Sequence, residues 1–264
     1  CAGEPAQVDE QTAAQRAARL MSVALHASDN PESLTFVIGT EVPLPGGARV
    51  DSHGDIAATT AANAAATLQA HESAFVDAGL GDVRALVSGL VVQPGVEFGP
   101  MTVYHLPLDR SFDLRSVMMR WPNLALEAHS TDYQKPAAYP RLAELGFAYQ
   151  KVGPALTFAW RQAIYALDQM LSFLQGSAPI VIPTMERIML ENAGAWQSHY
   201  QGEPNAKFAQ RHLALADRIR YYWPHPDAQA AVSALMTAME SQTLNRSVSE
   251  LFFPNSTLER AELC

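Results

Sequence analysis

Short apolar runs closed by a polar residue and a Pro or Gly turn recur along the first part of the chain. They are rich in β-branched and aromatic residues, which is typical of strands buried within a layered fold. The predicted strands occupy residues 34–42, 84–93, 124–127 and 147–152. Before and between them, apolar residues recur at spacings of three and four, which predicts helices. These helices occupy residues 10–27, 55–78, part of 106–121, and 136–145.

After the last of these strands the pattern becomes helical throughout. A broad apolar stripe begins at Pro154 and ends at Gly176, and Pro is favoured at a first helical position. Further helices are predicted over residues 184–197, 206–222 and 226–240. The strand–helix alternation is therefore confined to the part of the chain that precedes this helical stretch.

Strands that alternate with helices indicate an α/β fold with a parallel sheet. Four such units amount to half of a (β/α)8 TIM barrel, and a half barrel on its own would expose two sheet edges. We expect residues 1–176 to form the C-terminal half of such a barrel, and residues 177–264 to form a helical extension packed on it. We also expect the sequence to be the latter part of a longer chain, or to find its missing strands elsewhere.

Parallel pairing places the carboxyl ends of all these strands on one edge of the sheet, where ligands bind in α/β folds. Glu127, His129, Asp132 and Lys151 follow or end two neighbouring strands and should gather there. Glu127 and His129 are two residues apart on a strand, so they point to the same side. They could bind a divalent metal or act as an acid–base pair. A structural network in which Glu127 anchors a loop explains them equally well.

Lys151 comes directly before Gly153 and a predicted helix. A lysine at this place could pair with a phosphate group seated on the helix N-terminus, where free N–H groups point outward, or could form a Schiff base. We favour the phosphate. A salt bridge from Lys151 to Glu127 on the adjacent strand is compatible with it.

Other polar groups lie at the predicted strand ends or in the helical tail. Glu41, Gln93 and Glu97 would supply hydrogen-bonding groups suited to the hydroxyls of a polyol, although polar residues at strand ends are often only turn-forming. Arg218 belongs to a polar–aromatic cluster, residues 217–223, and could reach a phosphate or an interface. On a helix it would share a face with Tyr222, and packing of the tail onto the barrel is the simpler explanation.

Composition excludes several classes of partner. A formal charge of −9 and a pI near 5.3 argue against nucleic acid, whose binding needs lysines and arginines. No apolar run reaches the roughly 20 residues needed to span a membrane. The cysteines, Cys1 and Cys264, have neither disulfide nor metal spacing, and no signal peptide is present in this sequence, so we expect a cytoplasmic protein. No P-loop, dinucleotide-binding or nucleophile-elbow motif occurs, which disfavours a kinase.

Several longer phrases resemble one family: VIGTEVPLPGG, VVQPGVEF, EAHSTDYQKP, KVGPALTFAWRQAIYAL and DRIRYYWPH. It is the non-catalytic subunit of class II D-tagatose-1,6-bisphosphate aldolase, whose members have also carried the name tagatose-6-phosphate kinase. The resemblance runs from the first residue to about residue 225. It implies an aldolase-type barrel that lacks its first four strand units here, in galactitol and N-acetylgalactosamine catabolism.

The resemblance also implies a partner, a separate catalytic aldolase subunit that holds the zinc and whose activity and stability this chain supports. A ketose phosphate is a further expected ligand, and self-association into a homo-oligomer stays open. The residues that match the family's strand-end motifs are Glu41, Gln93, Glu127, His129, Asp132, Lys151 and Gly153. The alternative is a sugar-phosphate enzyme in its own right, either a metal-dependent lyase or a tagatose-6-phosphate kinase.

Overall fold

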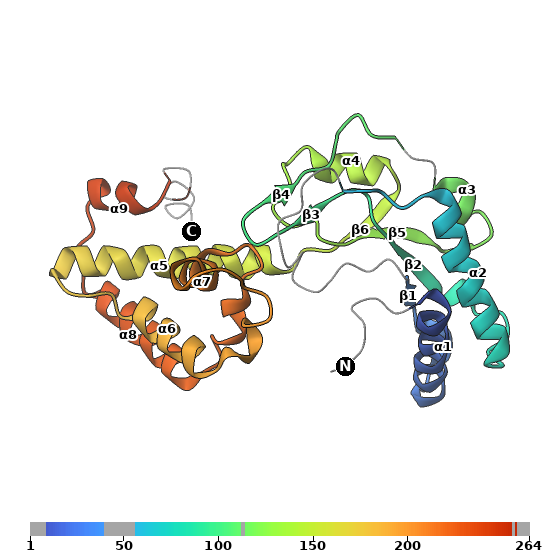
Figure 1. Cartoon of the computed structure of the whole chain (residues 1–264), viewed down its shortest axis with the longest axis horizontal. Coiled ribbons are helices and arrows are strands. Elements are labelled where there is room, and N and C mark those ends of the chain that lie inside the picture. The colour runs from blue at the N-terminus through green and yellow to red at the C-terminus, as the bar shows by residue number, and fades with distance from the viewer. Residues whose placement is uncertain (1–8, 40–55, 112–113, 255–256, 258–264) are drawn as a thin grey trace. The chain divides into compact units, whose positions relative to one another are not determined.

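The chain folds into two compact units, Cys1–Gly153 and Pro154–Cys264, each considered by itself. The computed structural model describes residues 9–39, 56–111, 114–254 and 257 (Figure 1). The first unit contains a sheet with helices, and the described part of the second contains helices alone. The predicted α/β class is therefore confirmed. None of the helices in these described ranges is both long and apolar enough to cross a membrane.

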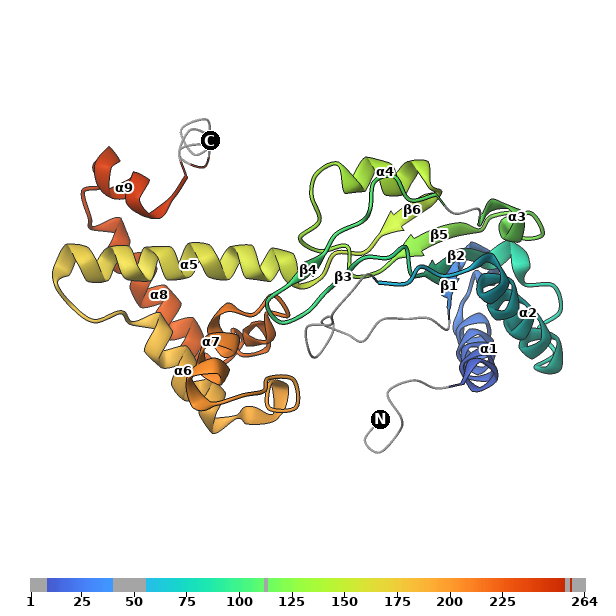
Figure 2. The same cartoon turned by 45° about the horizontal axis from the view of Figure 1, so that its top comes forward.

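The first unit is organised around a parallel sheet. Its four strands lie in the order β1-β2-β5-β6, and every neighbouring pair is parallel. The strands are β1 (Phe36–Ile38), β2 (Val87–Val92), β5 (Ala125–Ala128) and β6 (Phe147–Gln150). Figure 2 shows β5 and β6 running side by side. The predicted parallel pairing is confirmed, whereas closure into a barrel stays a prediction.

Helices pack against one face of this sheet. A row of apolar residues crosses all four strands and is 5% exposed or less: Ile38, Leu90, Leu126 and Phe147. These side chains share a core with residues of α1 (Glu10–Ala27), α2 (Ala61–Asp77) and α4 (Ala138–Glu144). Because successive residues of a strand point to opposite faces, Glu127 projects away from this core.

Side-chain caps explain where two of these helices begin. The carboxylate of Asp9 accepts the backbone N–H of Thr12 at 2.9 Å and so caps α1. The hydroxyl of Thr60 accepts the backbone N–H of Asn63 at 3.1 Å and caps α2. Each cap satisfies one of the N–H groups that a helix start leaves without an intrahelical partner.

The connections between strands differ most from the sequence-based expectation. The helix α3 (Arg115–Met118) has only 4 residues of the predicted stretch 106–121. An antiparallel hairpin precedes it, formed by β3 (Glu97–Phe98) and β4 (Val103–Tyr104), which the sequence pattern did not reveal because each strand has 2 residues. Single-turn helices η1 (Pro31–Ser33) and η2 (Arg84–Leu86) precede β1 and β2.

The second unit is built from helices around its own core. The helices are α5 (Pro154–Gln175), α6 (Val181–Glu191), η3 (Ala193–Ala195), α7 (Pro204–Leu213), η4 (Arg218–Tyr221), α8 (Pro226–Glu240) and α9 (Arg246–Phe252). The predicted helix 206–222 is divided in two: α7 ends at Leu213, where Ala214 is extended with φ of −62° and ψ of 143°, and η4 begins after Asp217, which is left-handed with φ of 45°. Buried residues of α5, α6 and α8 belong to one hydrophobic core. The predicted domain boundary at residue 176 stays a prediction.

Candidate functional site

The carboxyl ends of β2, β5 and β6 bring most of the predicted site residues to one edge of the sheet. Ala128 pairs with Val92 on one side and with Gln150 on the other. The backbone N–H of Lys151 donates to the carbonyl of Ala128 at 2.9 Å. Gln93, His129 and Lys151 therefore directly follow three paired strand ends. We call this the strand-end site, made of Gln93, Glu127, His129, Asp132, Lys151 and Gly153.

Glu127 and His129 form the closest polar pair of the strand-end site. His129 Nε2 lies 2.6 Å from Glu127 Oε1, and the two side chains are 13% and 12% exposed. The prediction that both point to the same side is confirmed. A carboxylate that holds an imidazole in this way can orient it for proton transfer. The pair thus has the geometry for acid–base chemistry, and equally for a structural hydrogen bond.

A metal site would need more ligands than this pair supplies. Among the residues that the structure describes, no group of three or more His, Cys, Asp or Glu side chains is arranged to hold a metal ion. Protein zinc sites use three or four such ligands. The described residues of this chain therefore do not form a metal site by themselves, and Glu127 and His129 would provide two ligands at most.

The loop that follows β5 is tied to the end of β6. Asp132 Oδ1 accepts the backbone N–H of Gly153 at 2.8 Å, and Thr131 Oγ1 donates to the carbonyl of Lys151 at 2.8 Å. Asp132 is 2% exposed and Thr131 is fully buried. Asp132 thus fixes the backbone just before α5. Its carboxylate already engages the N–H group of Gly153.

Lys151 has its ammonium group available to a ligand. The residue is exposed, and no ion pair joins it to Glu127 or to another residue in the described ranges. The salt bridge expected between Lys151 and Glu127 is therefore not formed. An exposed ammonium is a ready partner for a phosphate group.

Gln93 shapes the turn after β2. Its side-chain oxygen accepts the backbone N–H groups of Gly95 at 2.8 Å and Val96 at 2.9 Å. Gly95 has φ of 94°, a conformation that glycine adopts readily. Glu41, the remaining predicted member of the site, lies outside the described residues.

Glu97 proves to be a more central residue than its sequence position suggested. It is 9% exposed, and its Oε1 accepts the backbone N–H of Phe98 at 2.9 Å. Burial raises the pKa of Glu97, and the charge of Asp132 also raises it, against lowering by hydrogen bonds from Phe98 N–H and the Ser130 side chain. The one available signal was an acidic residue placed inside the apolar stretch 96–98.

Arg218 is held by its own helical unit. Its Nε donates to the carbonyl of Ala195, and its guanidinium lies 5.1 Å from the ring centre of Tyr221. Arg220 lies 4.4 Å from the same ring, and both arginines belong to the single-turn 3-10 helix η4. Burial lowers the pKa of Arg218. These contacts are those of a packing residue.

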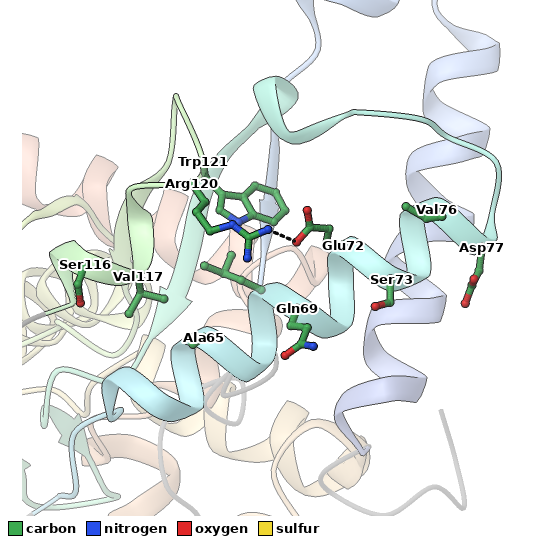
Figure 3. A pocket seen from close by; sticks show the side chains of 11 residues that line it. Ala65, Gln69, Glu72, Ser73, Val76, Asp77, Ser116, Val117, Arg120 and Trp121 are labelled. Carbon is green, nitrogen blue, oxygen red and sulfur yellow. Dashed lines mark ion pairs between the residues drawn. The ribbon is translucent and has the colours of Figure 1, made fainter.

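A groove of 710 Å³ lies elsewhere in the first unit, between α2 and the short α3 (Figure 3). Trp121 and Val76 line it, and Arg120 reaches across to Glu72, with Nη2 3.6 Å from Oε2. The residues of the strand-end site do not contribute to its lining.

Comparison with known proteins gives a consistent family. The family model described as "D-tagatose-1,6-bisphosphate aldolase subunit GatZ/KbaZ-like" matches residues 1–262. A D-tagatose 6-phosphate 4-epimerase of Agrobacterium fabrum is 44% identical over 92% of this chain and 58% of its own length. The aldolase subunit GatZ of Klebsiella pneumoniae subsp. pneumoniae is 40% identical over 96% of this chain and 60% of its own.

The crystal structure of a probable tagatose 6-phosphate kinase from Sinorhizobium meliloti 1021 shows the same fold. Its chain is 37% identical to this one and matches it with a TM-score of 0.82. The match covers 99% of this chain and 64% of that one. This chain therefore spans about three fifths of the length of the relatives that it matches.

Proposed function

The chain belongs to the GatZ/KbaZ-like family of D-tagatose-1,6-bisphosphate aldolase subunits, and we propose that its protein is a non-catalytic subunit supporting a separate catalytic aldolase chain. The observation that carries this proposal is the family match over residues 1–262, joined by relatives named GatZ at about 40% identity. In this proposal the partner supplies the metal-dependent chemistry.

The same proposal includes the fold of the whole protein. Four parallel strand–helix units are half of a (β/α)8 barrel, and within the described sheet β1 and β6 each pair on one side. Val37 on β1 is 48% exposed and Tyr149 on β6 is 43% exposed, and both project from the sheet face opposite the core residues Ile38 and Leu126. Further strands of the full-length protein would pair with the open edges of β1 and β6 and enclose this face.

A ketose phosphate is the ligand that the strand-end site fits best. Lys151 offers an exposed ammonium, without an ion pair among the described residues, for the phosphate, and the Glu127–His129 pair offers hydrogen-bonding groups for hydroxyls. In the accessory role this binding would stabilise the subunit or the assembly, with the chemistry carried out by the partner.

The experiment that tests the accessory role is co-purification from cells that express both genes. The full-length protein is expected to retain the catalytic subunit, and the complex is expected to be more active than the catalytic subunit purified alone. Failure to co-purify at the concentrations of the assay would reject the proposed assembly.

A second candidate is an enzyme that itself acts on a sugar phosphate. The 2.6 Å contact between His129 and Glu127 favours it, because a histidine held by a carboxylate has the geometry of an acid–base pair. The relative of Agrobacterium fabrum carries the name of an epimerase that acts on D-tagatose 6-phosphate. Incubation of the purified full-length protein with D-tagatose 6-phosphate alone separates the two candidates.

A further inference from the structure

In the first unit, the β3–β4 hairpin contacts the loop that follows β5. The Tyr133 ring packs edge-on against Phe98, with centroids 5.5 Å apart and planes at 84°. Gln134 accepts the backbone N–H of Leu106 at 3.0 Å and donates to the carbonyl of Tyr104 at 3.1 Å. The hairpin therefore holds the distal part of this loop through an aromatic contact and two hydrogen bonds.

Glu97 reaches the near part of the same loop. Its buried carboxyl group receives a hydrogen bond from the Ser130 side chain and lies close enough to Asp132 to feel its charge. Ser130 and Tyr133 have φ of 54° and 62°, a left-handed region that L residues rarely adopt. Such conformations persist only where surrounding contacts hold them.

The loop in turn controls the end of β6. Asp132 binds the N–H of Gly153 at 2.8 Å, and Thr131 binds the carbonyl of Lys151 at 2.8 Å. A continuous series of contacts thus runs from the hairpin to the exposed lysine. Displacing the loop would move the backbone on both sides of Val152.

We propose that Glu97 is a positioning residue of the strand-end site, which acts through Ser130 and Asp132 to set where Lys151 and Gly153 lie. Its effect on a ligand rests on the proposed function, in which this site binds a ketose phosphate. The proposed effect of Glu97 on the loop after β5 does not depend on that function. Burial, and to a smaller extent the charge of Asp132, raise the pKa of Glu97.

The test compares three variants of the full-length protein. Glu97→Ala removes the carboxyl group, and Glu97→Gln keeps an uncharged group that accepts the same hydrogen bonds. Glu32→Gln is the matched control, since Glu32 is an exposed carboxylate on η1 of the same unit. The first readout is hydrogen exchange at the Gly153 amide, and the second is the dissociation constant for D-tagatose 6-phosphate.

Glu97→Ala is expected to speed hydrogen exchange at the Gly153 amide by roughly 10-fold or more. This is the effect of losing the hydrogen bond from the Gly153 N–H to the Asp132 carboxylate. Glu97→Ala is also expected to weaken binding of D-tagatose 6-phosphate about 10-fold. Glu97→Gln should restore both readouts, and Glu32→Gln should change neither. If the Gly153 amide exchanges at the native rate in Glu97→Ala, the proposal is overturned. It is also overturned if exchange becomes equally faster at the amides of Leu90 and Leu126 in the sheet and Glu97→Gln does not restore the native rates.

The two proposals fail separately. If the native protein does not bind D-tagatose 6-phosphate while Gly153 exchange still follows Glu97, ligand binding at the site is rejected and the positioning role stands. If the ligand binds equally well to the native protein and to Glu97→Ala with unchanged exchange, the positioning role is rejected and ligand binding stands.

Discussion

His129 Nε2 lies 2.6 Å from Glu127 Oε1, and a single residue, Ala128, separates the two along the strand end. The contact follows from strand geometry, because residues two apart project to the same side. It leaves both side chains partly accessible at the edge of the sheet where parallel strands present ligand sites. Two relationships therefore form the strand-end site: the spacing of residues along one strand, and the parallel pairing of neighbouring strands.

Glu127→Gln distinguishes the accessory role from catalysis by this chain. The amide can still bond to His129 but cannot take a proton. If the chain catalyses a reaction of D-tagatose 6-phosphate, turnover should fall by roughly 100-fold or more. In the accessory role, which we expect, the variant should stimulate the catalytic subunit to nearly the native extent. A turnover assay of the variant, alone and with its partner, gives the answer; loss of stimulation by a folded variant contradicts the expectation.

Lys151→Ala should remove the stabilisation that a ketose phosphate provides. A ligand at 100 times its dissociation constant stabilises the folded state by about 2.7 kcal/mol, so the melting temperature of the native protein should rise. The rise should disappear in Lys151→Ala, because the exposed ammonium is lost. Lys207→Ala on α7 is the control and should retain it. An equal rise in native protein and Lys151→Ala, measured by thermal unfolding, would exclude Lys151 as a phosphate ligand.

The helical unit should lose stability as the pH falls through about 6.5. His212 is 3% exposed; its Nδ1 lies 2.6 Å from the Tyr165 hydroxyl and its Nε2 lies 3.0 Å from Glu186 Oε2. Burial lowers the pKa of His212 from its ordinary value of 6.5, against raising by Glu186. The unfolded chain therefore takes up a proton that the folded chain does not, and stability drops from pH 6.5 down to the folded pKa.

Urea unfolding at a series of pH values measures this effect. Tryptophan fluorescence reports mainly the helical unit, since Trp160, Trp196 and Trp223 lie in it and Trp121 lies in the first unit. His212→Gln should flatten the pH dependence between 7.5 and 5.5, two values chosen on either side of 6.5. An unchanged slope in this variant would show that another group causes the acid sensitivity.

Breaking the buried ion pair Arg161–Asp217 should destabilise the helical unit strongly. Arg161 Nε donates to Asp217 Oδ1 at 2.7 Å, and the side chains are 2% and 0% exposed. Asp217→Asn leaves the arginine charge buried and should cost about 3–5 kcal/mol in the free energy of unfolding. Asparagine also tolerates the left-handed conformation, with φ of 45°, that this position requires.

The double variant Arg161→Met with Asp217→Asn serves as the control for this pair. It removes both charges and should lose less stability than the sum of the two single variants. Chemical denaturation of the four proteins gives the coupling. If the stability lost by the double variant equals the sum of the losses of the two single variants, the two charges do not stabilise each other.

The sequence predicted the sheet well, because its strands are continuous apolar runs separated by helix-period segments. Helix α8 was predicted with its observed limits, Pro226–Glu240, since a proline marks its start. The hairpin at Glu97 was missed because strands of 2 residues leave no alternation to detect. The break between α7 and η4 was missed because the extended Ala214 and the left-handed Asp217 interrupt an otherwise helical apolar pattern.

The candidate site was predicted in part for similar reasons. Strand-end positions follow directly from parallel pairing, so the placement of Glu127, His129 and Lys151 could be foreseen. The partners of each side chain could not, because they depend on loop conformation. Asp132 proved to bind the backbone of Gly153, and Gln93 proved to hold its own turn. Glu97 gained its importance only from burial and from contacts with a loop that follows another strand.

The most direct test of the accessory role is the rate at which a fixed amount of the catalytic subunit cleaves D-tagatose-1,6-bisphosphate while the full-length protein is titrated into the assay. The rate is predicted to rise and then saturate, and the full-length protein by itself is predicted to give no cleavage. Robust cleavage by the purified protein alone, or a partner rate that stays constant across the titration, would contradict the account.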